Sequence, residues 1–294
     1  MTFVGCSVPE RFVNPLFEVF DGGDFILSSF RDVEEPLTRM RIYLPDPSQA
    51  EDASSRLKSA LDIVGVSSPI ETGDIPDEDW KFSYRRHFKI EAVGSRLLLV
   101  PAWERDNVSP AQAAGRQKII LDPGLAFGTG RHETTRACLE FIDDVLKSEK
   151  VASVLDMGCG SGILSIAASL LGVRDVRAFD VDEEAVRATR ENAAENGVSF
   201  PCVRFALGRK AALPNALAVA GSLSFDLVVA NILGPLLIRF ADEVAAPVGK
   251  FLVLSGILSE LYPEVRAAYE ARGFAEISSK TKGEWTSGLF ARQS

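Results

Sequence analysis

The sequence predicts an α/β fold in which a small α/β sandwich precedes a mostly parallel sheet with helices on both faces. Strand-like apolar runs alternate with helix-length segments from residue 151 onward, which is typical of such sheets. Residues 104–116 are polar and contain Asn, Ser, Pro and Gly, which marks a boundary. We therefore expect a first domain at 1–103, a linker at 104–116 and a second domain at 117–294.

Short apolar runs predict the elements of the first domain. We expect strands at 15–20, 25–30 and 39–44, with Asp21-Gly22-Gly23 as a turn between the first two. Apolar side chains recur at helical spacing over residues 48–64, which predicts an amphipathic helix behind the strands. Residues 96–101 are expected to close this domain as its last strand.

Strands and helices are expected to alternate in the second domain. The predicted strands are 151–156, 176–181, 226–232, 251–255 and 274–279, with 285–292 as an antiparallel edge strand. The predicted helices are 136–146, 163–171, 182–195, 236–244 and 259–272. This alternation predicts a sheet whose carboxyl edge is open to a ligand.

Composition excludes several classes of protein. The longest apolar runs are far shorter than the roughly 20 residues that cross a bilayer, so we expect no membrane contact and a cytoplasmic location. A net charge of −9 without a basic cluster disfavours nucleic-acid binding. The four cysteines form no C-x-x-C pair, so we expect neither a disulfide framework nor a metal site. Residues 1–95 hold 17 acidic against 10 basic residues, which could attract a basic partner or only keep the surface soluble.

A glycine-rich turn follows the strand at 151–156. Gly158, Gly160 and Gly162 alternate with Cys159 and Ser161, and glycine lets backbone approach a ligand closely. A dinucleotide site would read G-x-G-x-x-G, whereas Ile163 stands where its third glycine is expected. The turn therefore predicts a nucleotide-like ligand and disfavours an NAD-linked oxidoreductase, although a purely structural turn remains an alternative.

Polar residues end the next two inner strands. Asp180 lies at the end of the strand 176–181, where a carboxylate can accept both hydroxyls of a ribose. Asp182 is expected to be the N-cap of the following helix. Asn231 lies at the end of the strand 226–232 and is either a ligand-binding amide or a turn former.

A second glycine-rich segment precedes the sheet. Residues 121–135 contain glycines at 124, 128 and 130, and we expect this segment to close over a bound ligand, with Phe127 and Gly128 at the cofactor. Amides at the start of the next helix would suit an anion. The alternative is a capped helix after a static turn.

Together these motifs resemble the ribosomal protein L11 methyltransferase family. The resemblance is carried by DPGLAFGTG-x-H-x-TT, D-x-GCGSGIL-x-IAA, D-x-D, ENAAENGV, VVANIL, LSGIL and the late GEW. It is strong over residues 116–294 and thinner before them. It implies a Rossmann-like class I methyltransferase domain with a seven-stranded sheet, S-adenosylmethionine as cofactor, and a first domain that recognises the ribosomal protein.

Carried over to this chain, the resemblance assigns cofactor contacts to Thr135, Gly158, Asp180 and Asn231; the glycine turn adds Gly160. The implied reaction is methylation of amines of ribosomal protein L11, on lysine side chains, with the N-terminal amine as a further candidate. Asn231 would help to orient the amine. His132 is a candidate for handling the proton, or else orders the segment before the helix. A lysine methyltransferase with another target and a non-catalytic S-adenosylmethionine-binding module are the alternatives.

Overall fold

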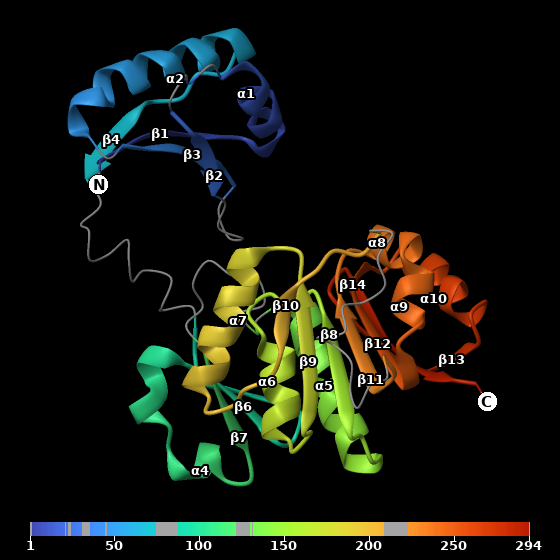
Figure 1. Cartoon of the computed structure of the whole chain (residues 1–294). Helices are drawn as coiled ribbons and strands as arrows, with labels where there is room; N and C mark the ends of the chain where they lie inside the picture. Colours follow the sequence, from blue (N-terminus) through green and yellow to red (C-terminus); the bar gives the residue numbers. More distant parts are fainter. Residues whose placement is uncertain are drawn as a thin grey trace. The chain divides into compact units, whose positions relative to one another are not determined.

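The computed structural model describes residues 2–20, 22, 25–30, 36–44, 46–74, 88–121, 130, 132–208 and 223–293. The chain divides into two units, residues 1–88 and 89–294, which have separate sheets (Figure 1). Their hydrophobic cores are also separate.

Unit 1 has a four-stranded antiparallel sheet, and its described residues also form two α-helices. Its elements are β1 (Thr2–Val8), η1 (Glu10–Phe12), α1 (Val13–Val19), β2 (Leu27–Phe30), β3 (Thr38–Leu44), η2 (Pro47–Gln49), α2 (Ala50–Val64) and β4 (Glu71–Asp74). The strand order is β2-β3-β1-β4. Alternate residues of β1 and β3, such as Val4 and Ile42, pack with Leu16 of α1 and Leu57 of α2 in one core, because side chains of a strand alternate between faces.

One prediction for this unit is wrong, and one of its strands was not predicted. Residues 15–20, predicted as a strand, belong largely to α1, since a short apolar run does not distinguish a strand from a buried helix. The strand at residues 2–8 was not predicted, although it pairs with both β3 and β4 in the middle of the sheet.

Unit 2 contains a seven-stranded sheet of order β10-β9-β8-β11-β12-β14-β13. Its strands are β8 (Ser153–Met157), β9 (Asp175–Asp180), β10 (Cys202–Arg204), β11 (Phe225–Asn231), β12 (Val248–Leu258), β13 (Phe274–Lys282) and β14 (Trp285–Arg292). The first five strands in this order are parallel, and β14 is antiparallel to both β12 and β13. The predicted mostly parallel sheet of seven strands is confirmed.

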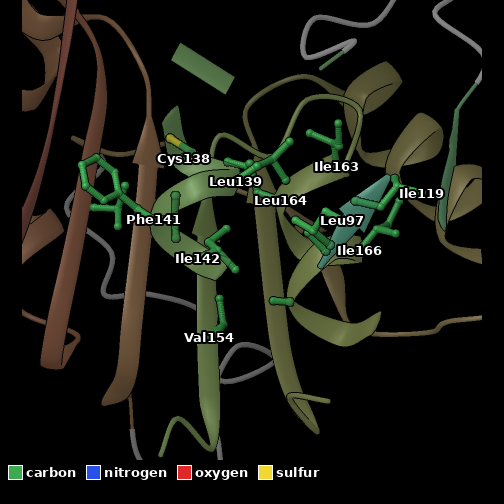
Figure 2. Close-up of a cluster of buried hydrophobic side chains, with 14 of the residues drawn as sticks. Leu97, Ile119, Cys138, Leu139, Phe141, Ile142, Val154, Ile163, Leu164 and Ile166 are labelled. Atoms are coloured by element: carbon green, nitrogen blue, oxygen red, sulfur yellow. The ribbon is translucent and has the colours of Figure 1, made fainter. Parts of the chain in front are cut away.

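Helices cover both faces of this sheet. They are α5 (Glu133–Ser148), α6 (Ile163–Leu170), α7 (Glu183–Glu195), α8 (Gly234–Arg239), α9 (Ala241–Ala245) and α10 (Tyr262–Glu270). Apolar side chains of α5, α6 and α7 form one core with one face of the sheet, and Figure 2 shows part of it. Side chains of α8, α9 and α10 form a second core on the opposite face.

The last strand occupies a different place from the one predicted. Residues 285–292 were expected at the edge of the sheet, but β14 lies between β12 and β13, and β13 is the edge strand. Phe290 of β14 is fully buried, which an inner position allows and an edge strand seldom requires. The antiparallel direction of β14 was predicted correctly.

The predicted domain boundary also differs from the division of the chain. Residues 96–101 were expected to close the first domain, but β6 (Leu97–Pro101) pairs with β5 (Glu91–Val93) and β7 (Gln117–Leu121) inside unit 2. Leu97 and Ile119 pack against α5 and α6 in the first core of that unit (Figure 2). Residues 104–116 therefore connect two strands of one sheet, through η4 (Ala102–Asn107) and α4 (Pro110–Ala113).

Candidate functional site

The glycine-rich turn joins β8 to α6 at the carboxyl edge of the sheet. Gly158, Gly160 and Gly162 have φ angles of 74°, 54° and 80°, a region that other residues enter only with strain. A Cβ on Gly158 would lie 2.6 Å from Cγ2 of Ile232, directly after β11. The predicted turn therefore needs glycine at Gly158 for two reasons, its backbone angle and its close approach to the next strand.

Asp180 ends β9 beside this turn. Its Oδ2 accepts a hydrogen bond from the backbone N–H of Gly160 at 2.9 Å, and its Oδ1 accepts one from the N–H of Asp182 at 3.0 Å. Each carboxylate oxygen has further acceptor capacity, so both can still accept ligand hydroxyls. The side chain of Asp182 accepts from the N–H of Glu184 at 3.0 Å, which confirms Asp182 as the N-cap of α7.

Asp156 is a buried carboxylate behind the glycine turn. Its Oδ2 accepts hydrogen bonds from the backbone N–H and the hydroxyl of Ser165 at 3.2 and 2.6 Å. Its Oδ1 has no hydrogen-bond partner among the residues that the structure describes. Burial raises the pKa of Asp156 to about 6, against the opposing effect of the Ser165 hydrogen bonds. Asp156 belongs to the glycine-turn motif, but no role for it was predicted from the sequence.

The cysteine of the glycine turn is close to a second cysteine. Sγ of Cys159 lies 3.6 Å from Sγ of Cys202 at the start of β10, and both thiols are buried and free. The hydroxyl of Thr189 on α7 donates to Cys159 at 3.3 Å. These contacts pack the turn against α7 and β10.

Asn231 ends β11 at the same edge of the sheet. Its Nδ2 donates to the hydroxyl oxygen of Thr135 in the first turn of α5 at 3.5 Å, which leaves its Oδ1 available as an acceptor. Thr135 is buried and contacts the site through Asn231, whereas its neighbour Thr134 lines the cavity.

His132 is the N-cap of α5. Its Nδ1 lies 2.8 Å from the hydroxyl of Thr134 and accepts from the backbone N–H of that residue at 3.4 Å. The imidazole packs edge-on against Trp285, the first residue of β14, with ring centroids 5.1 Å apart. Through these contacts His132 joins the start of α5 to the indole of Trp285.

These groups surround one cavity of about 630 Å³, a size typical of small-molecule sites. Gly158, Gly160, Asp180, Asn231 and His132 line it. The further lining residues are Thr134, Met157, Phe179, Val181, Phe205, Ala206, Leu207, Ile232, Leu233, Leu236, Phe240, Gly256 and Trp285. A mostly apolar cavity with one carboxylate, that of Asp180, among its lining residues suits a ligand that combines a flat apolar ring with vicinal hydroxyls.

Several lining residues were not predicted from the sequence. Phe205 and Leu207 follow β10, a strand of three residues that was not predicted. Gly256 did carry a signal, since it interrupts an apolar run. Its φ is +80°, and a Cβ there would lie 2.5 Å from the carbonyl oxygen of Ile232.

The predicted cofactor contacts at Phe127 and Gly128 lie outside the described residues. Gly130 is the one glycine of this segment that the structure describes. It is buried with φ +83°, and a Cβ would lie 2.7 Å from Leu99 and 2.9 Å from Ile163. Gly130 is thus part of the packed interior.

Two further findings concern metals and membranes. In the described ranges no group of three or more His, Cys, Asp or Glu side chains is arranged to hold a metal ion. Among the described helices, none combines the length and apolar character needed to cross a membrane.

Most of this chain is similar in sequence to known proteins. Residues 27–293 match the family model described as ribosomal protein L11 methyltransferase (PrmA). The chain is 38% identical to the ribosomal protein L11 methyltransferase of Synechococcus sp. (strain RCC307), over 87% of this chain and 84% of that one. It is 36% identical to the enzyme of the same name from Citrifermentans bemidjiense, over 96% and 95%.

A solved structure agrees with the sequence matches. The ribosomal protein L11 methylase from Lactobacillus delbrueckii subsp. bulgaricus superposes with a TM-score of 0.60 at 29% identity, covering 70% of this chain and all of that one. The family model, the curated relatives and the solved structure point to one assignment. The chain belongs to the ribosomal protein L11 methyltransferase family.

Proposed function

We propose that this protein transfers methyl groups from S-adenosylmethionine to amines of ribosomal protein L11, chiefly lysine side chains. The observation that carries the proposal is the cavity at the carboxyl edge of the sheet, where Asp180, Asn231 and the glycine turn converge. A ribosomal protein as methyl acceptor also supports a cytoplasmic location.

The residues of the cavity fit S-adenosylmethionine. The two oxygens of Asp180 retain acceptor capacity for the ribose hydroxyls. The exposed side chain of Val181, with Phe205 and Leu207, offers apolar surface for the adenine ring. Gly158 keeps the backbone open where a Cβ would collide with Ile232.

The bound cofactor supplies an electrophilic methyl group on a sulfonium that is already a good leaving group. The chain must hold a neutral amine in line with that methyl group, and orientation alone can lower such a barrier by several kcal/mol. Oδ1 of Asn231 is free to accept an N–H of the amine, since its Nδ2 donates to Thr135. An amide orients the amine but does not take up its proton.

The apolar cavity favours the uncharged form of a lysine. A lysine amine has an ordinary pKa near 10.4, and desolvation lowers it. Phe240, Leu236 and Trp285 give the cavity its apolar character. We propose that the amine releases its proton to solvent as it enters, so that His132 is required for position rather than as a base.

We also propose that unit 1 recognises the protein substrate. The sheet face opposite its helices presents Phe3, Arg41 and Tyr43. The Arg41 guanidinium lies 4.2 Å from the centroid of the Phe3 ring, and Phe3 is paired directly with Tyr43 across β1 and β3. Aromatic and arginine side chains are enriched at protein interfaces.

The test is transfer of a labelled methyl group to purified ribosomal protein L11. We expect incorporation into L11 that falls sharply in a chain without unit 1 and in the Asp180→Ala variant. Incorporation into another protein of a cell extract, with none into L11, would contradict the proposed substrate. Cofactor binding without incorporation into any protein would contradict the proposed catalysis.

A further inference from the structure

A second cavity adjoins the one that holds the cofactor. Its volume is about 470 Å³, and it shares Leu233, Gly256 and Trp285 with the first. The two cavities are therefore neighbours, and residues of α8 (Gly234 and Pro235) and α10 (Glu264) line the second. We call it the α8–α10 groove.

The wall of the groove is apolar and exposed. Leu233 is 63% exposed and Leu258 at the end of β12 is 37% exposed. Large aliphatic side chains with this exposure, beside a half-buried indole at Trp285, form a surface that the methylene stem of a long side chain can cover.

Two carboxylates lie at the same groove. Glu260 follows β12 and Glu264 lies in the first turn of α10, and both are exposed. No ion pair joins either of them to another residue in the described ranges. The nearest cation along the helix, Arg266, already pairs with Glu270 and Glu276.

One structural role competes with a binding role. A carboxylate in the first turn of a helix stabilises the helix dipole, and this accounts in part for Glu264. Glu260 precedes the helix by two residues and caps no backbone N–H in a described hydrogen bond, so the dipole does not account for it. The two residues can therefore be tested separately.

We propose that the α8–α10 groove binds a positively charged segment of the methyl acceptor, with a basic side chain that flanks the target lysine placed at Glu260 and Glu264. This rests on the proposed function, which supplies a lysine-bearing protein as substrate. Two observations favour a basic segment as the occupant. The negative charges of Glu260 and Glu264 complement it, and the groove shares a wall with the cofactor cavity. Exposed charge pairs of this kind contribute to capture of the substrate more than to chemistry.

The first experiment compares steady-state kinetics of the full-length wild type and Glu260→Gln/Glu264→Gln with L11 as substrate. We expect KM for L11 to rise about tenfold, since each exposed pair contributes modestly, with kcat within twofold. The dissociation constant for S-adenosylmethionine, measured by calorimetry, should not change. The single variant Glu260→Gln should show part of the KM effect without a change in melting temperature.

The matched control is Glu149→Gln/Glu191→Gln. These two glutamates are exposed at the end of α5 and on α7, so the variant has the same change in net charge far from the groove in sequence and on other elements. We expect its KM to equal that of the wild type. An equal rise of KM in both double variants would show a general charge effect and overturn the groove as a site.

A second measurement tests the groove independently of whether L11 is the substrate. The probe is a fluorescent lysine-rich peptide, titrated into the full chain saturated with S-adenosylmethionine. We expect Glu260→Gln/Glu264→Gln to weaken binding about tenfold at low salt and the difference to shrink at high salt. Failure of the wild type to methylate L11 would contradict the proposed function alone, whereas equal affinity of wild type and variant for the peptide would overturn the groove.

Discussion

Nε of Arg96 donates a hydrogen bond to Oδ1 of Asp143 at 2.7 Å. The same carboxylate accepts from the backbone N–H of Ser95 at 2.6 Å and from Nζ of Lys147 at 2.7 Å. Asp143 is fully buried on α5, while Ser95 and Arg96 form the turn between β5 and β6. The Asp143 side chain thus holds the β5–β6 hairpin against α5, which explains why the hairpin belongs to unit 2.

Asp143→Asn should destabilise the protein strongly. Removing one partner from a buried ion pair typically costs about 3–5 kcal/mol, and here two cations and one amide lose a charged acceptor. Chemical denaturation measures the loss. Asp144→Asn is the control, because Asp144 is exposed on the same helix and its replacement should change the free energy of unfolding far less. Equal losses in the two variants would contradict this role of Asp143.

The contribution of Asp143 to stability should depend on pH. Burial alone would raise the pKa of Asp143, but hydrogen bonds from Lys147, Arg96 and Ser95 outweigh it and hold the pKa well below its usual range. The stabilising contribution is therefore present above the unfolded pKa of about 4 and is lost as pH falls below it. The gap in stability between wild type and Asp143→Asn should narrow as the pH is lowered from about 6 toward about 3.

Asp156→Asn should behave in the opposite way. The pKa of Asp156 is raised to about 6 by burial, so the wild type loses stability as pH rises from about 4 to about 6 and the asparagine does not. We expect the variant to gain up to about 3 kcal/mol relative to wild type at pH 7. Melting temperatures at pH 4 and pH 7 measure this; a constant difference between the two would contradict the raised pKa.

Asp180→Ala should weaken S-adenosylmethionine binding by at least about tenfold. Two hydrogen bonds to a charged group, each of roughly 1.5–3 kcal/mol, would be lost. Calorimetry gives the dissociation constant. Asp182→Ala is the control, because loss of an N-cap costs about 1 kcal/mol of stability and should leave cofactor affinity nearly unchanged. An unaltered affinity in a folded Asp180→Ala protein would remove Asp180 from the site.

Gly130→Val should reduce stability along with activity. A valine there would meet Leu99 and Ile163, and its backbone would have to keep φ at +83°, a strain of about 1–3 kcal/mol. The control Gly115→Val separates side-chain crowding from backbone strain. Gly115 also has a positive φ, +70°, but no atom lies within 4 Å of the place that a Cβ would occupy. We expect the larger loss of melting temperature at Gly130, and an equal loss would show that crowding contributes nothing.

A chain of residues 89–294 should bind S-adenosylmethionine like the full chain but methylate L11 poorly. All described residues that line the cofactor cavity lie in unit 2, whereas the proposed recognition face lies in unit 1. A chain of residues 117–294 should instead fail to fold well, because it lacks β5 and β6. Calorimetry and methyl incorporation test both, and undiminished methylation by residues 89–294 would contradict the role of unit 1.

Elements with strong local patterns were predictable from the sequence. The apolar strands β8, β9 and β11, the helices α6 and α7, and the glycine turn between β8 and α6 lie close to their predicted positions. Gly158, Gly160, Asp180 and Asn231 could be placed in one cavity because parallel strands end at one edge of the sheet.

Strand pairings that depend on contacts between distant segments of the chain could not be predicted from local sequence patterns. The pairing of β6 with β7 and the insertion of β14 between β12 and β13 are set by packing between segments far apart in the chain. The same is true of Trp285, which the sequence placed at a strand start but which reaches the cavity only through that insertion. Local propensity carries no information on which strand becomes the neighbour of another.

The inner position of β14 has a consequence for the order of events during synthesis. The ribosome delivers β12 and β13 before β14, so these two strands emerge without the strand that lies between them. Until residues 285–292 arrive, the sheet has a gap, Phe290 is missing from the second core, and the cofactor cavity lacks the wall that Trp285 supplies. A nascent chain therefore completes the second core and this wall of the cavity only when its last strand has been delivered.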